Sequence, residues 1–215
     1  MANLQTSLRA VLPREIAVEA TGIPQNHVRA NARWREMLPP RCSQKRLAEF
    51  AVGRYCAARA LGRLGARTTD VGVGSAREPI APEGYSVSIS HDDCHAVAVA
   101  GRSAAWPGLG IDIEPDSPLD AELLAVVCSD SERASRPDDI TELDYAKQLF
   151  SIKESVFKAA YPRVQTVLDW PQIAVALEGE DRFVAGLRNV AVPDMRIEGF
   201  SRRLCGKWIS FASVA

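Results

Sequence analysis

Two carboxylates, Asp112 and Glu114, are the first feature of the sequence that could carry chemistry. They belong to the segment Gly-Ile-Asp-Ile-Glu, residues 110–114, whose alternation of apolar and acidic side chains predicts a half-buried strand. On a strand both carboxylates project from one face, with Cα atoms about 6.5–7 Å apart. They repel each other, and a hard divalent cation relieves that repulsion. The pattern indicates a metal site, although an exposed strand edge with solvated acids has the same spacing.

A second charged group lies on a predicted helix over residues 143–161, which we expect to end at Pro162. Lys153 falls near the middle of the apolar stripe of this helix, where an ammonium must reach an anion or extend to solvent. Glu154 and Lys158 share the adjoining face. A surface ion pair of that spacing stabilises a helix by only ~0.2–0.5 kcal/mol and is common, but it does not explain Lys153. One carboxylate and two ammoniums beside the acidic strand suit a metal-bound polyphosphate.

Two cationic side chains occur earlier in the chain, at His91 and Arg54. His91 follows Ser90 in a loop at the end of a predicted strand, a position where side chains are often functional. Arg54 lies in the apolar stripe of a first predicted helix, about residues 44–64, where burial of a guanidinium is costly without an anionic partner. Pairing with a nearby carboxylate such as Glu49, or extension to solvent, would explain it without any function.

The elements that position these residues follow from hydrophobic periodicity and from glycine and proline signals. Residues 1–44 are expected to be irregular, because prolines interrupt them. The remaining elements are predicted as strands over 85–90, 94–100, 109–114, 167–177 and 181–192, one or two strands within 194–214, and a short helix near 119–128. The order helix, strands, helix, strands predicts two similar α+β halves joined near residues 102–107.

Composition limits the classes of protein that this chain can represent. The 215 residues are 47% hydrophobic and 25% charged, as in a soluble globular protein, and the formal net charge of −1 argues against bulk binding of nucleic acid. No apolar run approaches the ~18 residues of a membrane span, and residues 1–20 contain no signal-peptide core. The five scattered cysteines lack a Cys-x-x-Cys pair, so we expect reduced thiols in the cytoplasm.

Three blocks together resemble the signature blocks of the Sfp-type 4′-phosphopantetheinyl transferases. They are Ser-Ile-Ser-His at 88–91, Gly-Ile-Asp-Ile-Glu at 110–114 and Phe-Ser-Ile-Lys-Glu-Ser-Val-Phe-Lys at 150–158. Residues 45–60 further resemble the bacterial subgroup that includes the enterobactin synthase activating component. Leu-Asp-Trp at 168–170 also matches the family, so the resemblance covers about residues 41–177 in all.

The resemblance implies an α+β fold of two pseudo-symmetric α/β halves, residues 1–105 and 106–215. Each half would be a small, mainly antiparallel sheet packed on a long helix, with coenzyme A in the cleft between the halves. Mg²⁺ would be held by Asp112, Glu114 and Glu154. The residues that the resemblance assigns to coenzyme A binding are Arg46, Arg54, Arg77, Ser90, His91, Asp112, Lys153 and Lys158.

The reaction implied by the resemblance moves 4′-phosphopantetheine from coenzyme A to a serine of an apo acyl, peptidyl or aryl carrier protein. The products would be holo carrier protein and 3′,5′-ADP. Glu154 is the candidate general base, directly or through water, Lys158 would stabilise charge on the phosphate, and Asp112 completes the catalytic set. We expect a cytoplasmic monomer acting in siderophore, nonribosomal peptide or polyketide synthesis, with no nucleic acid partner and no membrane span.

Two other interpretations fit parts of the pattern. One is a catalytically inactive carrier-protein-binding module of the same fold, which would not need the carboxylate trio or Lys158. The other is a different Mg²⁺-dependent phosphate enzyme, such as a hydrolase that uses Asp112 and Glu114. That second interpretation does not account for the order of the three blocks.

Overall fold

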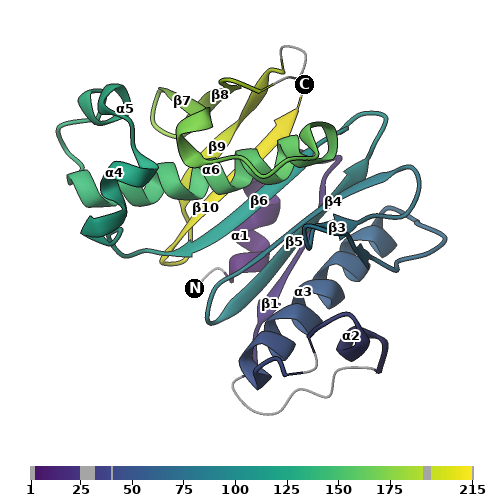
Figure 1. The fold of residues 1–215 in the computed structure, drawn as a ribbon. Coiled ribbons are helices and arrows are strands. Elements are labelled where there is room, and N and C mark those ends of the chain that lie inside the picture. The colour runs from purple at the N-terminus through teal and green to yellow at the C-terminus, as the bar shows by residue number, and fades with distance from the viewer. Residues whose placement is uncertain (1–2, 25–31, 40, 191–194, 215) are drawn as a thin grey trace. The chain divides into compact units, whose positions relative to one another are not determined.

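The computed structural model describes residues 3–24, 32–39, 41–190 and 195–214. The chain divides into two compact units, residues 1–105 and 106–215 (Figure 1). Each unit contains an antiparallel sheet with one long helix packed against it, which confirms the α+β class. Within the described ranges, no helix has both the length and the apolar character that crossing a bilayer requires.

The first unit contains a three-stranded sheet in the order β1–β5–β4, with the long helix α3 against one face (Figure 1). Its elements are α1 (Leu4–Val11), β1 (Ala17–Gly22), α2 (Ala32–Glu36), α3 (Gln44–Arg63), β2 (Gly72–Val73), β3 (Pro79–Ile80), β4 (Tyr85–His91) and β5 (His95–Arg102). Ser43 begins α3 as its N-cap, since its Oγ accepts the backbone N–H of Arg46 at 3.1 Å. The predicted helix over 44–64 is therefore confirmed.

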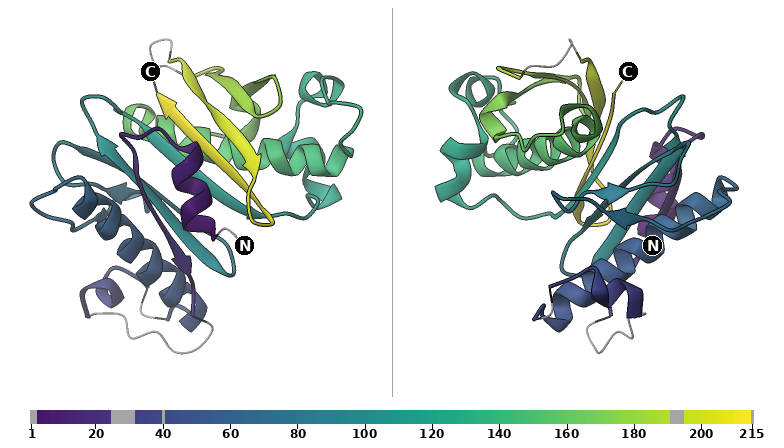
Figure 2. Two further views of the ribbon diagram at one scale, coloured as in Figure 1. Left: turned by 180° about the vertical axis from the view of Figure 1, so that it is seen from behind. Right: turned by 45° about the vertical axis from the view of Figure 1, so that its right-hand side comes forward.

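The expectation that residues 1–44 are irregular is wrong, because α1 and β1 lie within them (Figure 2). Asn3 caps α1, and β1 pairs along its length with β5. The side chain of Gln5 reaches from α1 to the open edge of β1, where its amide donates to the Val18 carbonyl and accepts the N–H of Ala20. This contact satisfies backbone groups that an edge strand leaves unpaired, and only the tertiary fold supplies it.

Small residues let α3 lie close to its sheet. Ala96, Ala98 and Ala100 of β5 are fully buried against the helix. A Cβ atom added to Gly53 of α3 would lie 2.9 Å from the side chain of Ile89 on β4, closer than real Cβ contacts. The short distance places the polar face of α3 next to the C-terminal end of β4.

The second unit contains a five-stranded sheet in the order β6–β10–β9–β8–β7, with α6 packed on β6 and β10. Its elements are β6 (Leu109–Pro115), the 3₁₀ turn η1 (Ala121–Leu123), α4 (Leu124–Val127), α5 (Asp130–Ala134), α6 (Glu142–Val164), the 3₁₀ turn η2 (Trp170–Gln172), β7 (Ile173–Glu178), β8 (Arg182–Leu187), β9 (Ile197–Arg203) and β10 (Lys207–Val214). Helix α6 continues through Pro162, contrary to prediction, and ends at Gln165 in the left-handed conformation (φ 52°).

The backbone of β6 lies directly against α6 because Gly110 within the strand and Gly108 just before it have no side chains. A Cβ atom at Gly110 would lie 1.8 Å from the carbonyl oxygen of Ser155, and one at Gly108 would lie 2.2 Å from that of Ala159. Backbone atoms cannot give way as a flexible side chain can, so both positions require glycine. Since alternate residues of a strand share a face, Asp112 projects from the same face as Gly110, toward α6.

Candidate functional site

The two acids of β6 are each bound to a lysine of α6. Nζ of Lys158 donates to Oδ1 of Asp112 at 2.7 Å and to the carbonyl of Ile111 at 3.2 Å. Nζ of Lys147 lies 2.6 Å from Oε2 of Glu114. Asp112 is only 3% exposed, whereas the side chain of Lys158 is 24% exposed, so this ammonium remains in reach of solvent.

Glu154 completes the acidic group from α6. Its Oε1 accepts the indole N–H of Trp170 at 3.2 Å. Burial raises the pKa of Glu154, Lys158 opposes that rise, and the charge of Asp112 adds to it. Burial likewise raises the pKa of Glu114, and Asp112 again contributes repulsion. Asp112 therefore interacts electrostatically with both glutamates.

The donor chemistry of this group fits Mg²⁺, which prefers hard oxygen ligands such as carboxylates. Glu114 and Glu154 are desolvated and repelled by Asp112, and a divalent cation would relieve both penalties. Among the residues that the structure describes, no three acidic, histidine or cysteine side chains already form a metal-binding cluster. The two lysines instead supply the positive charge.

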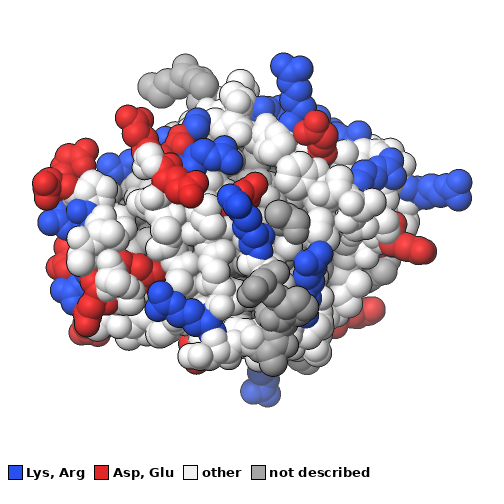
Figure 3. Space-filling view, turned by 90° about the horizontal axis from the view of Figure 1, so that it is seen from above, with Lys and Arg blue, Asp and Glu red and all other residues white. Residues whose placement is uncertain are grey.

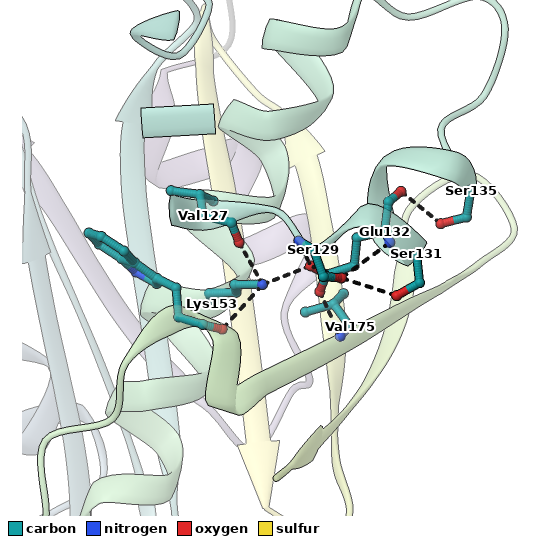
Figure 4. A network of polar contacts seen from close by, with 8 residues as sticks. Val127, Ser129, Ser131, Glu132, Ser135, Lys153 and Val175 are labelled. Carbon is teal, nitrogen blue, oxygen red and sulfur yellow. Dashed lines mark hydrogen bonds and ion pairs between the residues drawn. The ribbon is translucent and has the colours of Figure 1, made fainter. Parts of the chain in front are cut away.

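Lys153 does not face an open site, and the prediction that it contacts a phosphate is wrong. Its side chain is 1% exposed, and Nζ donates to Oε2 of Glu132 at 2.9 Å and to the carbonyls of Val127 and Trp170 at 2.7 and 3.2 Å (Figure 4). An ammonium has three donors, and all three are used here. The sequence showed that this charge needed an anion, but the anion is Glu132 of the same unit.

Two contacts of this site had only weak signals in the sequence. Trp170 packs its ring against Phe150 with centroids 5.5 Å apart and holds Glu154 through its indole N–H. Lys147 binds Glu114 and lies 5.6 Å from the centre of the Phe150 ring. Trp170 belongs to a block already noted for its family resemblance, whereas Lys147 is indistinguishable in sequence from a solvated surface lysine.

The first unit contains a basic pocket of about 300 Å³ next to α3. Its walls come from the segment before α3, from α3 itself, from β2 and β3 with the turn between them, and from the end of β4. The polar side chains that line it are Arg46, Glu49, Arg54, Arg77 and His91. Four of these five residues carry a positive charge or can acquire one, so the pocket favours an anion.

Three side chains of this pocket are in mutual contact. Nη1 of Arg46 lies 2.9 Å from Nε2 of His91 and 3.4 Å from Oε2 of Glu49. The same Glu49 oxygen lies 3.8 Å from Nε2 of His91. Glu49 therefore supplies negative charge to Arg46 and His91.

Arg54 is the least compensated cation of the pocket. It is 6% exposed, and its guanidinium lies 4.9 Å from the centre of the Phe50 ring. Its Nη1 is buried and has no hydrogen-bond partner among the described residues, so the alternative that Glu49 pairs with it is not what the structure shows. Burial, and then repulsion from Arg46, lowers the pKa of Arg54 to about 10. An anion in the pocket would relieve this penalty.

Arg77 and Ser90 differ in their relation to the pocket. Arg77 lines it from the turn that joins β2 to β3, where its φ of 68° is left-handed. Such strain in a residue other than glycine is common at functional sites. Ser90 does not line this pocket, because the pleat of β4 turns it to the opposite face from Ile89 and His91. The structure therefore brings His91 but not Ser90 to this pocket, and the assignment of Ser90 to the coenzyme A site stays a prediction.

The excess of positive charge in the pocket is local. On the face drawn in Figure 3, lysine and arginine side chains are interspersed with aspartate and glutamate, consistent with the net charge of −1. A guanidinium buried inside a pocket can be reached by a small polyanion that enters the pocket, but not by a large ligand that binds only to the surface.

Comparisons with known proteins identify the family of this chain. A model of the 4′-phosphopantetheinyl transferase N-terminal domain matches residues 36–101, and the model of the 4′-phosphopantetheinyl transferase superfamily matches residues 108–200. The chain is 38% identical to 4′-phosphopantetheinyl transferase Svp of Streptomyces mobaraensis over 178 residues, 78% of this chain and 69% of the relative. It is 33% identical to 4′-phosphopantetheinyl transferase PptT of Mycobacterium tuberculosis over 62% of this chain and 60% of the relative. It is also 38% identical to enterobactin synthase component D of Salmonella typhimurium, over 56% and 51%.

Proposed function

Because this chain belongs to the 4′-phosphopantetheinyl transferase superfamily, we propose that it transfers 4′-phosphopantetheine from coenzyme A to a serine of an apo carrier protein. The products are holo carrier protein and 3′,5′-ADP. The observation that carries the proposal is the coupled acidic group of β6 and α6, in which Lys158 binds Asp112. This group lies within the residues that the superfamily model matches.

The basic pocket of the first unit is proposed to bind the phosphates of the nucleotide end of coenzyme A. Arg46, Arg77 and His91 offer donors along its wall, and Arg54 offers a buried Nη1 that lacks a partner among the described residues. Hydrogen bonds to charged groups contribute about 1.5–3 kcal/mol each, because both partners are largely desolvated. Coenzyme A carries a 3′-phosphate and a pyrophosphate, and either provides such an anion.

The acidic group of the second unit is proposed to act at the pyrophosphate. Asp112, Glu114 and Glu154 would hold Mg²⁺, which neutralises pyrophosphate charge and orients the group for in-line displacement. Lys158 keeps an ammonium close to Asp112 yet partly exposed, so it is able to donate to a phosphate oxygen. Charge that develops on the transferring or leaving phosphate is thereby stabilised.

Glu154 is the proposed base that takes the proton of the attacking serine, directly or through a water molecule. The indole N–H of Trp170 holds one carboxylate oxygen and fixes its orientation. The serine oxygen then attacks the β-phosphate of coenzyme A.

The proposed partner is an acyl, peptidyl or aryl carrier protein of siderophore, nonribosomal peptide or polyketide synthesis. Similarity to the protein named enterobactin synthase component D supports the siderophore part of this range. The proposal includes a cytoplasmic monomer. All five cysteines lie in described ranges and none is in a disulfide, as a reducing compartment would require.

Incubation of the protein with coenzyme A, Mg²⁺ and purified apo carrier proteins tests the activity. Mass spectrometry should show one phosphopantetheine added to the carrier, with an equal amount of 3′,5′-ADP released. A carrier whose acceptor serine is replaced by alanine should remain unmodified. Binding of the carrier without a mass change would indicate an inactive module, and release of 3′,5′-ADP without carrier modification would indicate a hydrolase.

A further inference from the structure

Lys153 and Glu132 form a buried ion pair whose hydrogen bonds reach five elements of the second unit, namely α4, α5, α6, η2 and β7 (Figure 4). Oε2 of Glu132 accepts from Nζ of Lys153 at 2.9 Å and from the backbone N–H of Ser129 at 2.8 Å. Oε1 accepts the N–H of Val175 at 3.2 Å. The pair thereby ties α5 and β7 to α6, and the bond from Lys153 to the carbonyl of Trp170 adds η2.

Stability alone does not require this ion pair. Buried ion pairs are often replaceable by apolar side chains at no net cost, because the desolvation penalty offsets the attraction between the charges. Both side chains here are nearly inaccessible, 1% for Lys153 and 6% for Glu132. The pair instead fixes the positions of the backbone groups that it binds, at Val127, Ser129, Trp170 and Val175.

Trp170 is the group through which this pair can affect the acidic site. Its backbone carbonyl accepts from Lys153 at 3.2 Å, while its indole N–H donates to Glu154 at 3.2 Å. Lys153 and Glu154 are consecutive on α6, and successive helical side chains diverge by about 100°. Lys153 and Glu154 therefore do not contact each other through their side chains, but Trp170 forms a hydrogen bond with each of them.

We infer that Lys153 and Glu132 are positioning residues that fix Trp170, whose indole then orients Glu154 in the acidic site. The inference rests on the proposed function, in which Glu154 is a metal ligand and base. It assigns to Lys153 an indirect role in place of the phosphate contact expected from the sequence. Loss of outer contacts of this kind typically weakens metal affinity or activity about 10- to 100-fold.

The test uses the full chain with the double substitution Lys153→Met and Glu132→Gln. It removes both charges together and leaves one amide oxygen, which can accept from the N–H of either Ser129 or Val175. In metal-free protein, the indole N–H of Trp170, assigned in nitrogen-15 spectra by its loss in Trp170→Phe, should exchange with solvent about tenfold faster than in wild type. Calorimetry should show affinity for Mg²⁺ weakened about 10- to 100-fold. The matched control is Arg133→Gln on α5, the helix that also carries Glu132. It removes an exposed ion pair with Glu142 of α6 and should change neither the indole exchange rate nor the affinity for Mg²⁺.

Trp170→Phe alone keeps the ring and the carbonyl but removes the indole donor. It should weaken Mg²⁺ binding by a similar factor, and adding it to the double substitution should cause little further loss, because both changes break one chain of contacts. Unchanged indole exchange and Mg²⁺ affinity in the folded double variant, or fully additive losses, would overturn the inference. If the double variant does not fold, unchanged Mg²⁺ affinity in Trp170→Phe overturns it equally.

The exchange measurement separates this inference from the proposed function. Suppose that the wild-type protein modifies no carrier, but that the substitutions change indole exchange and Mg²⁺ affinity as expected. This result would refute the transferase proposal and leave the positioning role intact. Normal transfer with unresponsive exchange and affinity would do the reverse.

Discussion

The ammonium of Lys158 lies 2.7 Å from Oδ1 of Asp112, although 46 positions separate the two residues in the sequence. One belongs to β6 and the other to α6. Their approach depends on Gly110, whose missing side chain lets the strand lie against the helix backbone at Ser155. In the Gly-Ile-Asp-Ile-Glu segment, the glycine is therefore required for packing against α6, whereas the two acids supply the charge of the proposed site.

Asp112→Asn should reduce carrier modification by about 10²–10³-fold or more, because it removes a main source of negative charge from the proposed metal site. Asparagine preserves the size of a side chain that is only 3% exposed and can still accept from Lys158. Circular dichroism should show an intact fold. Turnover close to that of wild type at low Mg²⁺ would contradict the metal assignment.

Gly110→Ala should destabilise the protein by about 1–3 kcal/mol or more, because the new methyl group meets the backbone of α6. For a chain of this size, that loss lowers the melting temperature by roughly 2–4 °C per kcal/mol. Gly186→Ala on β8 is the control, since a Cβ atom there meets nothing within 4 Å. Equal melting temperatures for the two variants would show that α6 can move away from β6 freely.

Lys153→Met alone should cost about 3–5 kcal/mol, because it leaves Glu132 as a buried charge without its partner ammonium. The double variant Lys153→Met with Glu132→Gln should recover much of that loss, since no buried charge remains. Urea unfolding of the two variants and of wild type measures the difference. A single variant as stable as wild type would mean that Glu132 finds another cation or is protonated.

Arg54→Met should weaken binding of 3′,5′-ADP roughly 10- to 100-fold while leaving stability unchanged or higher. Burial lowers the pKa of Arg54 to about 10, below its unfolded value, so the charged form is penalised in the folded protein. That penalty is present at every pH below about 10 and fades only as the pH rises further. At neutral pH, methionine removes it.

Calorimetric titration and thermal melting at pH 7.5 measure both effects of Arg54→Met. Arg59→Met changes an exposed arginine on the same helix and should alter neither quantity. A loss of stability without any loss of affinity would assign Arg54 to the fold rather than to the pocket.

The cysteines should separate into three classes by their rate of reaction with a thiol reagent at pH 8. Burial raises the pKa of Cys56 to about 12 and that of Cys128 to about 11, so both stay as unreactive thiols. Cys94 and Cys205 are exposed and should be labelled first, with Cys42 slower. Peptide mapping by mass spectrometry identifies the order. Rapid labelling of Cys56 in folded protein would show that α3 separates readily from its sheet.

The sequence alone identified the α+β class, both long helices and the face of β6 that carries two acids. These features depend on side-chain periodicity and residue type, which are local properties of the chain. It also showed that Arg54 and Lys153 were cations in apolar stripes that needed an explanation.

Only the tertiary structure decided what those two cations bind. Arg54 lines a pocket with one donor that lacks a described partner, whereas Lys153 is fully used by Glu132 and two carbonyls. A cationic side chain in the apolar stripe of a helix thus has a different role in each unit. The partner of a buried charge comes from segments far away in the chain, and no local pattern encodes which segment packs there. The strand β1 was missed for the same reason, since β5 and Gln5 satisfy its backbone groups from elsewhere in the fold.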